Sequence, residues 1–253
     1  MPLITCYANP RKVYSRMVCE ALAAGCGGTV AYDYVPREGI AFVLGMDENA
    51  RRLIRASEDW YQIDHGYFGR MNYFRITHRG LWTDGRGRAD HKRLERLRLP
   101  IRIRKAFPLG DVVLAIQTPA MYQWYGLDSL QWVDETVARC QRHTHRAILL
   151  RHKPVRQYRN AVPFPELLRT AWAVVCHSSG AAIEALIEGV PVVVTEQAFP
   201  AARLGIAFGE LERPRVPTVD ERRDLFARLA AQQWSIDEMA AGITWRELND
   251  GAR

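Results

Sequence analysis

The residues best suited to chemistry lie in the second half of the chain, where a polar turn follows an apolar run. The run Ala173–Cys176 ends at His177, Ser178, Ser179 and Gly180, and a helical pattern begins there. A strand, a polar turn and a helix in this order predict a βαβ unit, whose ligand crevice lies at the carboxyl end of the strand. Free helix amides and the positive end of the helix dipole would face that crevice. We therefore expect a phosphate site at this turn.

Glu184 lies one turn further along the same predicted helix, where its carboxylate could accept hydrogen bonds from ribose hydroxyls. A simpler alternative is that Ser178 and Ser179 only cap the helix and that Glu184 is an exposed surface residue. This segment alone leaves both interpretations open.

A basic cluster formed by Arg151, His152 and Lys153 follows another predicted strand and precedes Pro154. Three basic side chains could neutralise the phosphates of a nucleotide, and the proline would stiffen the loop. The alternative is an ordinary surface turn.

In the first half of the chain, Asp64 and His65 follow a predicted strand and precede Gly66. Asp64 could be a general base held on a tight turn, or it could simply belong to an Asp-x-Gly turn. His65 has no partner visible in the sequence, which favours a structural role over a catalytic one.

Strands and helices alternate along the chain, which predicts an α/β fold with mainly parallel sheets. The predicted strands are Leu3–Tyr7, Ile40–Leu44, Trp60–Ile63, Tyr73–Thr77, Val112–Ile116, Ala147–Leu150, Ala173–Cys176 and Val192–Thr195. The predicted helices are Val13–Ala24, Glu48–Ala56, Leu127–His143, Phe164–Trp172, Ala181–Glu188, Arg222–Gln232 and Ile236–Ala241, the last capped by Ser235. We expect a first lobe over residues 1–107, which includes a basic linker at 85–107, and a second lobe over 108–253. A cleft would separate them.

Composition narrows the class of protein. With 48% apolar and 25% charged residues in 253, the chain is typical of globular proteins. Its beginning lacks the apolar core of a signal peptide, and no apolar run approaches the ~18–20 residues that span a membrane. Five cysteines without CxxC spacing indicate reduced, mostly buried thiols in a cytoplasmic protein, and this spacing argues against metal binding by cysteine.

The positive charge is unevenly distributed. The stretch Arg86–Lys105 holds nine Arg or Lys against two acidic residues, within a chain of net charge +7. Such a stretch could bind nucleic acid, an anionic membrane surface or an acidic glycan. A solvated linker between lobes is the interpretation we favour.

Together and in this order, these motifs resemble those of GT-B glycosyltransferases, in which two Rossmann-like lobes face a central cleft. The pattern is most similar to that of capsule-synthesis enzymes and of Kdo and sialic acid transferases. Asp64-His65-Gly66 resembles their first-lobe acidic motif, and the segment Arg151–Pro154 resembles their His-Pro motif with an inserted Lys153. The turn at Ser178 and Ser179 resembles their Ser-Ser motif. The chain also resembles small glycosyltransferase-like proteins of phages and prophages, in the segments 63–77 and 229–248.

The resemblance implies a metal-independent glycosyltransferase without a cofactor, which uses a nucleotide sugar as donor and a glycan or a DNA base as acceptor. Asp64, or with less support His65, would remove the acceptor proton. The implied donor-binding residues are Gln117, Arg151, His152, Lys153, His177, Ser178, Ser179, Gly180 and Glu184. Two alternatives remain at this point: a non-catalytic nucleic-acid or glycan binding protein, and a nucleotide-sugar epimerase on the same fold.

Overall fold

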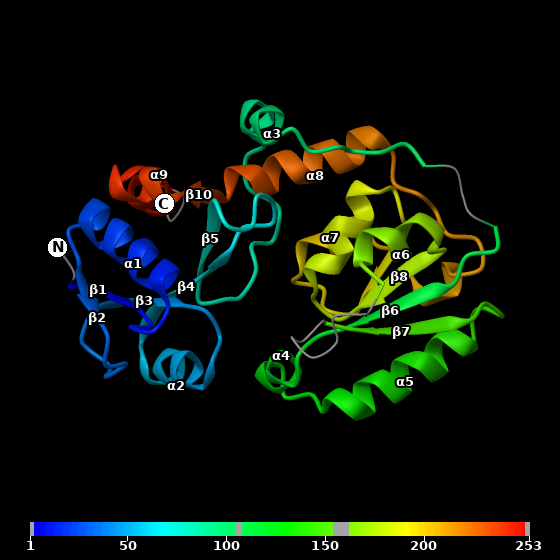
Figure 1. The fold of residues 1–253 in the computed structure, drawn as a ribbon, viewed down its shortest axis with the longest axis horizontal. Helices are drawn as coiled ribbons and strands as arrows, with labels where there is room; N and C mark the ends of the chain where they lie inside the picture. Colours follow the sequence, from blue (N-terminus) through cyan, green and yellow to red (C-terminus); the bar gives the residue numbers. More distant parts are fainter. Residues whose placement is uncertain (1–2, 105–107, 154–161, 251–253) are drawn as a thin grey trace. The chain divides into compact units, whose positions relative to one another are not determined.

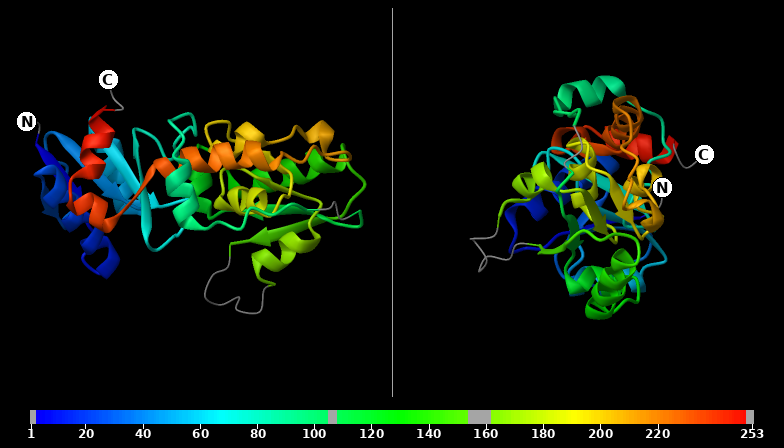
Figure 2. Two further views of the ribbon diagram at one scale, coloured as in Figure 1. Left: turned by 90° about the horizontal axis from the view of Figure 1, so that it is seen from above. Right: turned by 90° about the vertical axis from the view of Figure 1, so that its right-hand side faces the viewer.

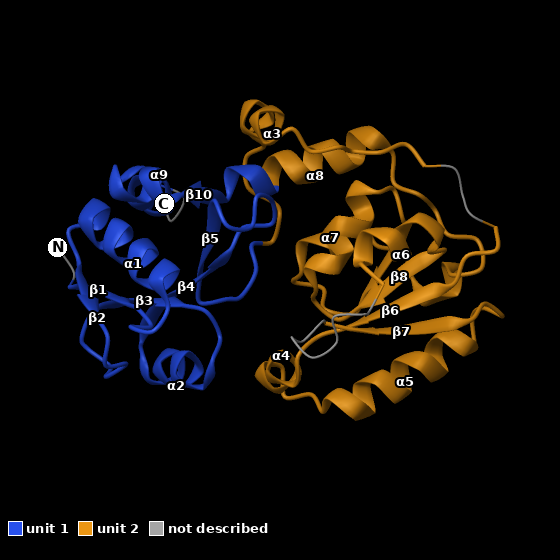
Figure 3. Ribbon diagram, in the orientation of Figure 1, with its two compact units in different colours: residues 1–83, 229–253 blue, residues 84–228 orange. Residues whose placement is uncertain are grey.

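The computed structural model describes residues 3–104, 108–153 and 162–250. The chain divides into two compact units (Figures 1 and 3), one formed by residues 1–83 with 229–253 and the other by 84–228. Each unit contains one sheet with helices on both faces, as two further views show (Figure 2). Within the described parts of the chain, no helix combines the length and apolar composition that crossing a bilayer would require.

The first unit is built on a six-stranded sheet of order β10-β5-β4-β3-β1-β2. The four strands β1 to β4 are parallel, and β5 and β10 add to one side in antiparallel register. The strands are β1 (Ile4–Tyr7), β2 (Thr29–Ala31), β3 (Ile40–Leu44), β4 (Asp59–His65), β5 (Tyr73–His78) and β10 (Gln233–Ser235). The helices are α1 (Val13–Cys26), α2 (Glu48–Ala56), α9 (Ile236–Ala240) and α10 (Ile243–Asp250).

Alternation along the strands separates two layers in this unit. Ile4, Phe42 and Ile63 point to the face that α1, α9 and α10 cover, and they form one apolar core with those helices. The α2 helix lies on the opposite face (Figure 1). Its start is fixed by Asp47, whose carboxylate accepts a hydrogen bond from the Ala50 amide.

The second unit has a four-stranded parallel sheet of order β7-β6-β8-β9. Its strands are β6 (Val112–Ile116), β7 (Ile148–His152), β8 (Ala173–Cys176) and β9 (Val192–Val194). The helices are α3 (His91–Leu97), α4 (Pro119–Trp124), α5 (Ser129–Gln141), α6 (Phe164–Thr170), α7 (Gly180–Ile187) and most of α8 (Val219–Ala231). Short 3₁₀ turns occupy Pro200–Leu204 and Phe208–Glu210.

The expectation of an α/β fold with two Rossmann-like sheets is confirmed. The five cysteines are free and buried, as predicted. The domain limits differ from the predicted ones at the end of the chain. Residues 229–253 belong to the first unit because β10 pairs with β5 and α9 packs on α1, whereas the sequence placed them in the second lobe.

The predicted basic linker also differs from the structure. It contains α3, and its described residues pack as part of the second unit. The Arg102 amide donates to the Ile187 carbonyl, and the Arg104 guanidinium donates to the carbonyls at the end of α6, among them Leu168 and Ala171. Lys105 lies outside the described residues. Some of this stretch's charge therefore stabilises the fold instead of facing a partner.

Candidate functional site

In the second unit, the predicted phosphate turn lies where strand order reverses. From β6 the chain passes to β7 on one side, and it later continues from β8 to β9 on the other. Ligands of open α/β sheets bind outside the carboxyl ends of the strands at such a switch point. Gln117 follows β6 and His177 follows β8, so the structure brings two of the predicted donor residues to this place.

Gln117 and Ser178 use their polar atoms on each other. The Gln117 side-chain amide donates to the Ser178 carbonyl over 2.7 Å, and the Ser178 amide donates back to Gln117 Oε1 over 3.1 Å. The Ser178 hydroxyl also donates to Gln117 Oε1, and Ser178 is fully buried. These two residues join the ends of β6 and β8. They therefore shape the turn, with most of their hydrogen-bonding capacity already used.

Ser179 and Gly180 open the α7 helix. The Ser179 hydroxyl accepts from the Ala181 amide over 3.2 Å, so the capping alternative describes this hydroxyl correctly. Gly180 is exposed, and a Cβ atom built on it would meet no other atom within 4 Å. The start of α7 at Gly180 thus borders open space, which an anion needs in order to approach a helix N-terminus.

His177 lies beneath the turn and not on its surface. Its ring packs among Tyr122, Tyr125 and Trp132, at centroid separations of 6.0, 4.6 and 6.0 Å, and Nδ1 lies 2.8 Å from the Thr195 hydroxyl. Nε2 is buried and has no partner within the described chain. Burial lowers the pKa of His177 below its ordinary value, although the Glu196 charge opposes the shift. The side chain therefore stays neutral at physiological pH.

The basic cluster lies at the end of β7, and the strand directs its members to different sides. Successive residues of a strand point to opposite faces, so Arg151 and His152 diverge. The Arg151 guanidinium lies 4.4 Å from the centre of the Phe164 ring. Burial lowers the pKa of Arg151, and the Glu184 charge opposes this shift, which places Glu184 in electrostatic contact with Arg151. His152 and Lys153 are exposed, and Pro154 lies outside the described residues.

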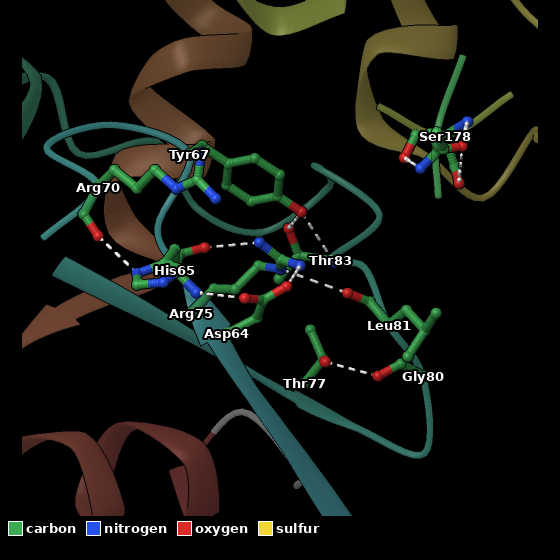
Figure 4. Close-up of polar contacts among 11 residues, drawn as sticks. Asp64, His65, Tyr67, Arg70, Arg75, Thr77, Gly80, Leu81, Thr83 and Ser178 are labelled. Atoms are coloured by element: carbon green, nitrogen blue, oxygen red, sulfur yellow. Dashed lines mark hydrogen bonds and ion pairs between the residues drawn. The ribbon is translucent and has the colours of Figure 1, made fainter. Parts of the chain in front are cut away.

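In the first unit, Asp64 forms an ion pair with Arg75 on the neighbouring strand β5 (Figure 4). Arg75 Nη2 lies 2.7 Å from Asp64 Oδ2, and the His65 amide donates to Asp64 Oδ1 over 2.8 Å. Burial alone would raise the pKa of Asp64, but the Arg75 charge and the His65 amide outweigh it and hold that pKa below its ordinary value. Asp64 is therefore a weaker base than an ordinary aspartate.

Arg75 was not among the residues selected from the sequence. It is 5% exposed, and its guanidinium also donates to the carbonyls of His65 and Leu81. The guanidinium carbon lies 4.3 Å from the centre of the Trp82 ring. Arg75 thus fixes the end of β4 and the loop that follows β5.

His65 points to the other face of β4, where its ring packs against Tyr14 and Phe74. Its Nδ1 lies 2.7 Å from the Arg70 carbonyl, which can only accept a hydrogen bond. Nδ1 therefore carries the hydrogen in the neutral ring, and the lone pair is on Nε2. This geometry gives His65 a free basic atom, whereas both Asp64 oxygens already accept hydrogen bonds.

The described residues contain no group of three or more His, Cys, Asp or Glu that could hold a metal ion. Metal independence of the reaction stays a prediction.

No protein-family model matches this chain, and a search of curated proteins by sequence found no match. Solved structures do match. The Thermosulfurimonas dismutans protein KpsC, beta Kdo 2,7 transferase, superposes with a TM-score of 0.58 at 14% identity, over 98% of this chain and 99% of that one. The beta Kdo 2,4 transferase of the same KpsC superposes with a TM-score of 0.52 at 14% identity, over 89% of each chain. The chain therefore shares the fold of Kdo transferases over nearly its whole length, as its motifs predicted.

Proposed function

We propose that this protein is a glycosyltransferase of the GT-B type, which transfers a sugar from a nucleotide-sugar donor to a hydroxyl group of a glycan. The observation that carries the proposal is the β8–α7 turn. An exposed Gly180 opens a helix at the switch point of a sheet, on a chain with the fold of Kdo transferases.

The second unit would bind the donor. The Gly180 amide would donate a hydrogen bond to the donor phosphate, and the positive end of α7 would attract its charge. The exposed His152 ends the neighbouring strand β7, and the exposed Lys153 follows it. Gln117 and Ser178 would act as positioning residues, because their mutual hydrogen bonds hold the turn in shape. Glu184 would bind the ribose beside Arg151.

The first unit would supply the base. In the proposed reaction an acceptor oxygen bonds to the anomeric carbon, and the bond from that carbon to the phosphate oxygen breaks. The hydroxyl proton passes to His65 Nε2, and the nucleotide leaves with the electron pair. Negative charge grows on the leaving phosphate, where the helix N-terminus would stabilise it. Of the two predicted bases, the geometry favours His65 as proton acceptor and Asp64 as its rigid neighbour.

The test begins with the donor. Thermal unfolding is measured with CMP, UDP, GDP and dTDP, each alone. A nucleotide present at 100 times its Kd adds about 2.7 kcal/mol of stability, which raises Tm by roughly 5–10 °C. The matching nucleotide sugar is then incubated with candidate glycans, and transfer is followed by mass spectrometry. Conversion of the nucleotide sugar without an acceptor would indicate an epimerase instead.

A pair of matched variants locates the donor site. Gly180→Asp places a carboxylate where the phosphate would lie, and the open space around Gly180 admits the new side chain without a clash. We expect at least a hundredfold loss of nucleotide affinity. Gly209→Asp is the control, because Gly209 is also exposed, belongs to the same unit and has equally open space. If both variants bind nucleotide like the wild type, the donor site is elsewhere.

A further inference from the structure

The first unit has a switch point of its own. From β1 the chain goes to β2 on one side, and β3 lies on the other side of β1. The helices that follow β1 and β3 cover opposite faces of the sheet (Figure 1). The carboxyl ends of these strands are therefore the second place in the molecule where fold alone predicts a ligand crevice.

A pocket of about 360 Å³ opens at this edge. This volume is in the range of small-molecule sites, roughly 300–1,000 Å³. Its lining comes from the segment after β1, the segment after β2 and the first turns of α2, and all of it belongs to the first unit. The polar residues of the lining include Asn9, Arg11, Tyr32, Tyr34, Asn49 and Arg52.

Two guanidinium groups give the pocket positive charge. Arg11 and Arg52 are exposed, and neither forms an ion pair within the described chain. Arg52 donates only to the Asn49 side chain, over 3.3 Å. The one carboxylate of the lining, that of Asp33, is already paired with Arg37 at 2.7 Å. The planar N–H donors of a guanidinium group suit carboxylate and phosphate oxygens.

The rest of the lining suits hydroxyl groups. The carboxamides of Asn9 and Asn49 retain N–H donors, because only their oxygens are used, by the Arg11 amide and by Arg52. Tyr34 is 9% exposed, and its hydroxyl has no partner within the described chain. Its backbone φ of 52° is left-handed, which costs energy for a residue other than glycine. An orphaned hydroxyl and a strained backbone at one pocket are typical of functional sites.

We propose that this pocket binds a small saccharide that carries an anionic group, either a carboxylate or a phosphate. Arg11 and Arg52 bind the anionic group, and the asparagine side chains bind sugar hydroxyls. The inference does not depend on the proposed transferase activity, because it concerns binding to the first unit without any nucleotide.

The experiment measures binding to the whole chain by calorimetry or by chemical-shift changes. The probes are glucuronate, glucose 6-phosphate, glucose and inorganic phosphate, each titrated at low salt. We expect saturable binding of at least one of the two anionic sugars and much weaker binding of glucose. Glucuronate and glucose 6-phosphate distinguish a carboxylate site from a phosphate site. Inorganic phosphate that binds as tightly as both sugars would show a simple anion site and overturn the saccharide assignment.

Three variants locate the binding. Arg11→Gln and Arg52→Gln should each weaken it about tenfold, the effect of one charge-assisted hydrogen bond. Arg55→Gln on the same helix removes an equal charge outside the pocket and should leave the affinity unchanged. Absence of saturable binding, or equal losses in all three variants, would overturn the inference. Nucleotide binding and its loss in Gly180→Asp are separate results, so this proposal and the proposed function can fail independently.

Discussion

At the carboxyl edge between β6 and β8, polar side chains bond to one another, whereas at the edge between β1 and β3 they line an open pocket. In the second unit, Gln117 and Ser178 bond to each other, and Gly180 beside them is exposed. In the first unit, Arg11 and Arg52 remain unpaired within the described residues. A switch point can thus offer a ligand either its backbone or its side chains, and the two should respond differently to mutation.

The largest effect is expected at the proposed base. His65→Gln removes the basic Nε2 and keeps a group that can donate to the Arg70 carbonyl. Transfer should slow by roughly 10²–10⁴-fold while nucleotide affinity stays near that of the wild type. Steady-state rates and thermal shifts measure the two quantities separately. Asp64→Asn is the companion variant, and a larger rate loss there than in His65→Gln would identify Asp64 as the base.

The next largest effect concerns stability of the first unit. Arg75→Met removes a buried guanidinium, so the His65 and Leu81 carbonyls lose their donor and Asp64 loses its ion pair. We expect a loss of about 2–4 kcal/mol in the free energy of unfolding, measured with urea. Arg79→Met, at an exposed arginine just after β5, should cost much less.

The stability that the Asp64–Arg75 ion pair contributes should depend on pH in a defined direction. The pKa of Asp64 is held down in the folded state, so the stabilisation is present above the ordinary aspartate value of about 3.9. It is lost as pH falls through the lower folded pKa. The stability difference between wild type and Arg75→Met should therefore shrink in acid. A difference that grew below pH 4 would contradict the assignment.

Two variants with smaller expected effects compare the β6–β8 edge directly with the β1–β3 edge. Gln117→Ala leaves the amide and carbonyl of buried Ser178 without partners, which should cost roughly 1–3 kcal/mol of stability. Asn49→Ala at the open pocket should change stability by less than about 0.5 kcal/mol, because its side chain is exposed. Urea unfolding of both variants provides the measurement. Equal losses would show that the two edges are built alike.

The smallest expected effect is the change in stability caused by protonation of His177. Because burial lowers its pKa in the folded state, protonation favours unfolding, and stability should fall as pH drops below about 6.5. The slope from one such group is at most about 1.4 kcal/mol per pH unit. His177→Gln should flatten the change between pH 7.5 and 5.5. If the two proteins lose stability in parallel over this range, His177 is not the group responsible.

The sequence predicted the elements that have clear local signals well. The strands Ile40–Leu44 and Val112–Ile116 and the helix Glu48–Ala56 have the expected bounds, since continuous apolar runs and an Asp N-cap mark them locally. The three-residue strands Thr29–Ala31 and Gln233–Ser235 were not predicted, because their pairing with β1 and β5 stabilises them more than their own composition does. The α3 helix in the basic stretch was not predicted, because its many charged residues leave few apolar positions from which a helical period could be recognised.

The sequence predicted the local backbone of the candidate site better than its side-chain contacts. A polar turn joins a strand to a helix at Gly180 as expected, yet the pairing of Gln117 with Ser178 joins residues 61 positions apart. The group of aromatic residues around His177 includes side chains from α4 and its end, and the sequence did not predict this helix. Contacts of this kind arise from tertiary packing, so spacing along the chain does not reveal them.

The return of residues 229–253 to the first unit makes that unit discontinuous, with the second unit inserted between its two parts. During synthesis, every residue of the second unit therefore leaves the ribosome before β10 does. The hydrogen bonds between the Gln233 side chain and the Phe68 backbone should therefore be among the last to form. The nascent chain should therefore fold its second unit first and close its first unit at the end, which reverses the usual order from the N-terminus.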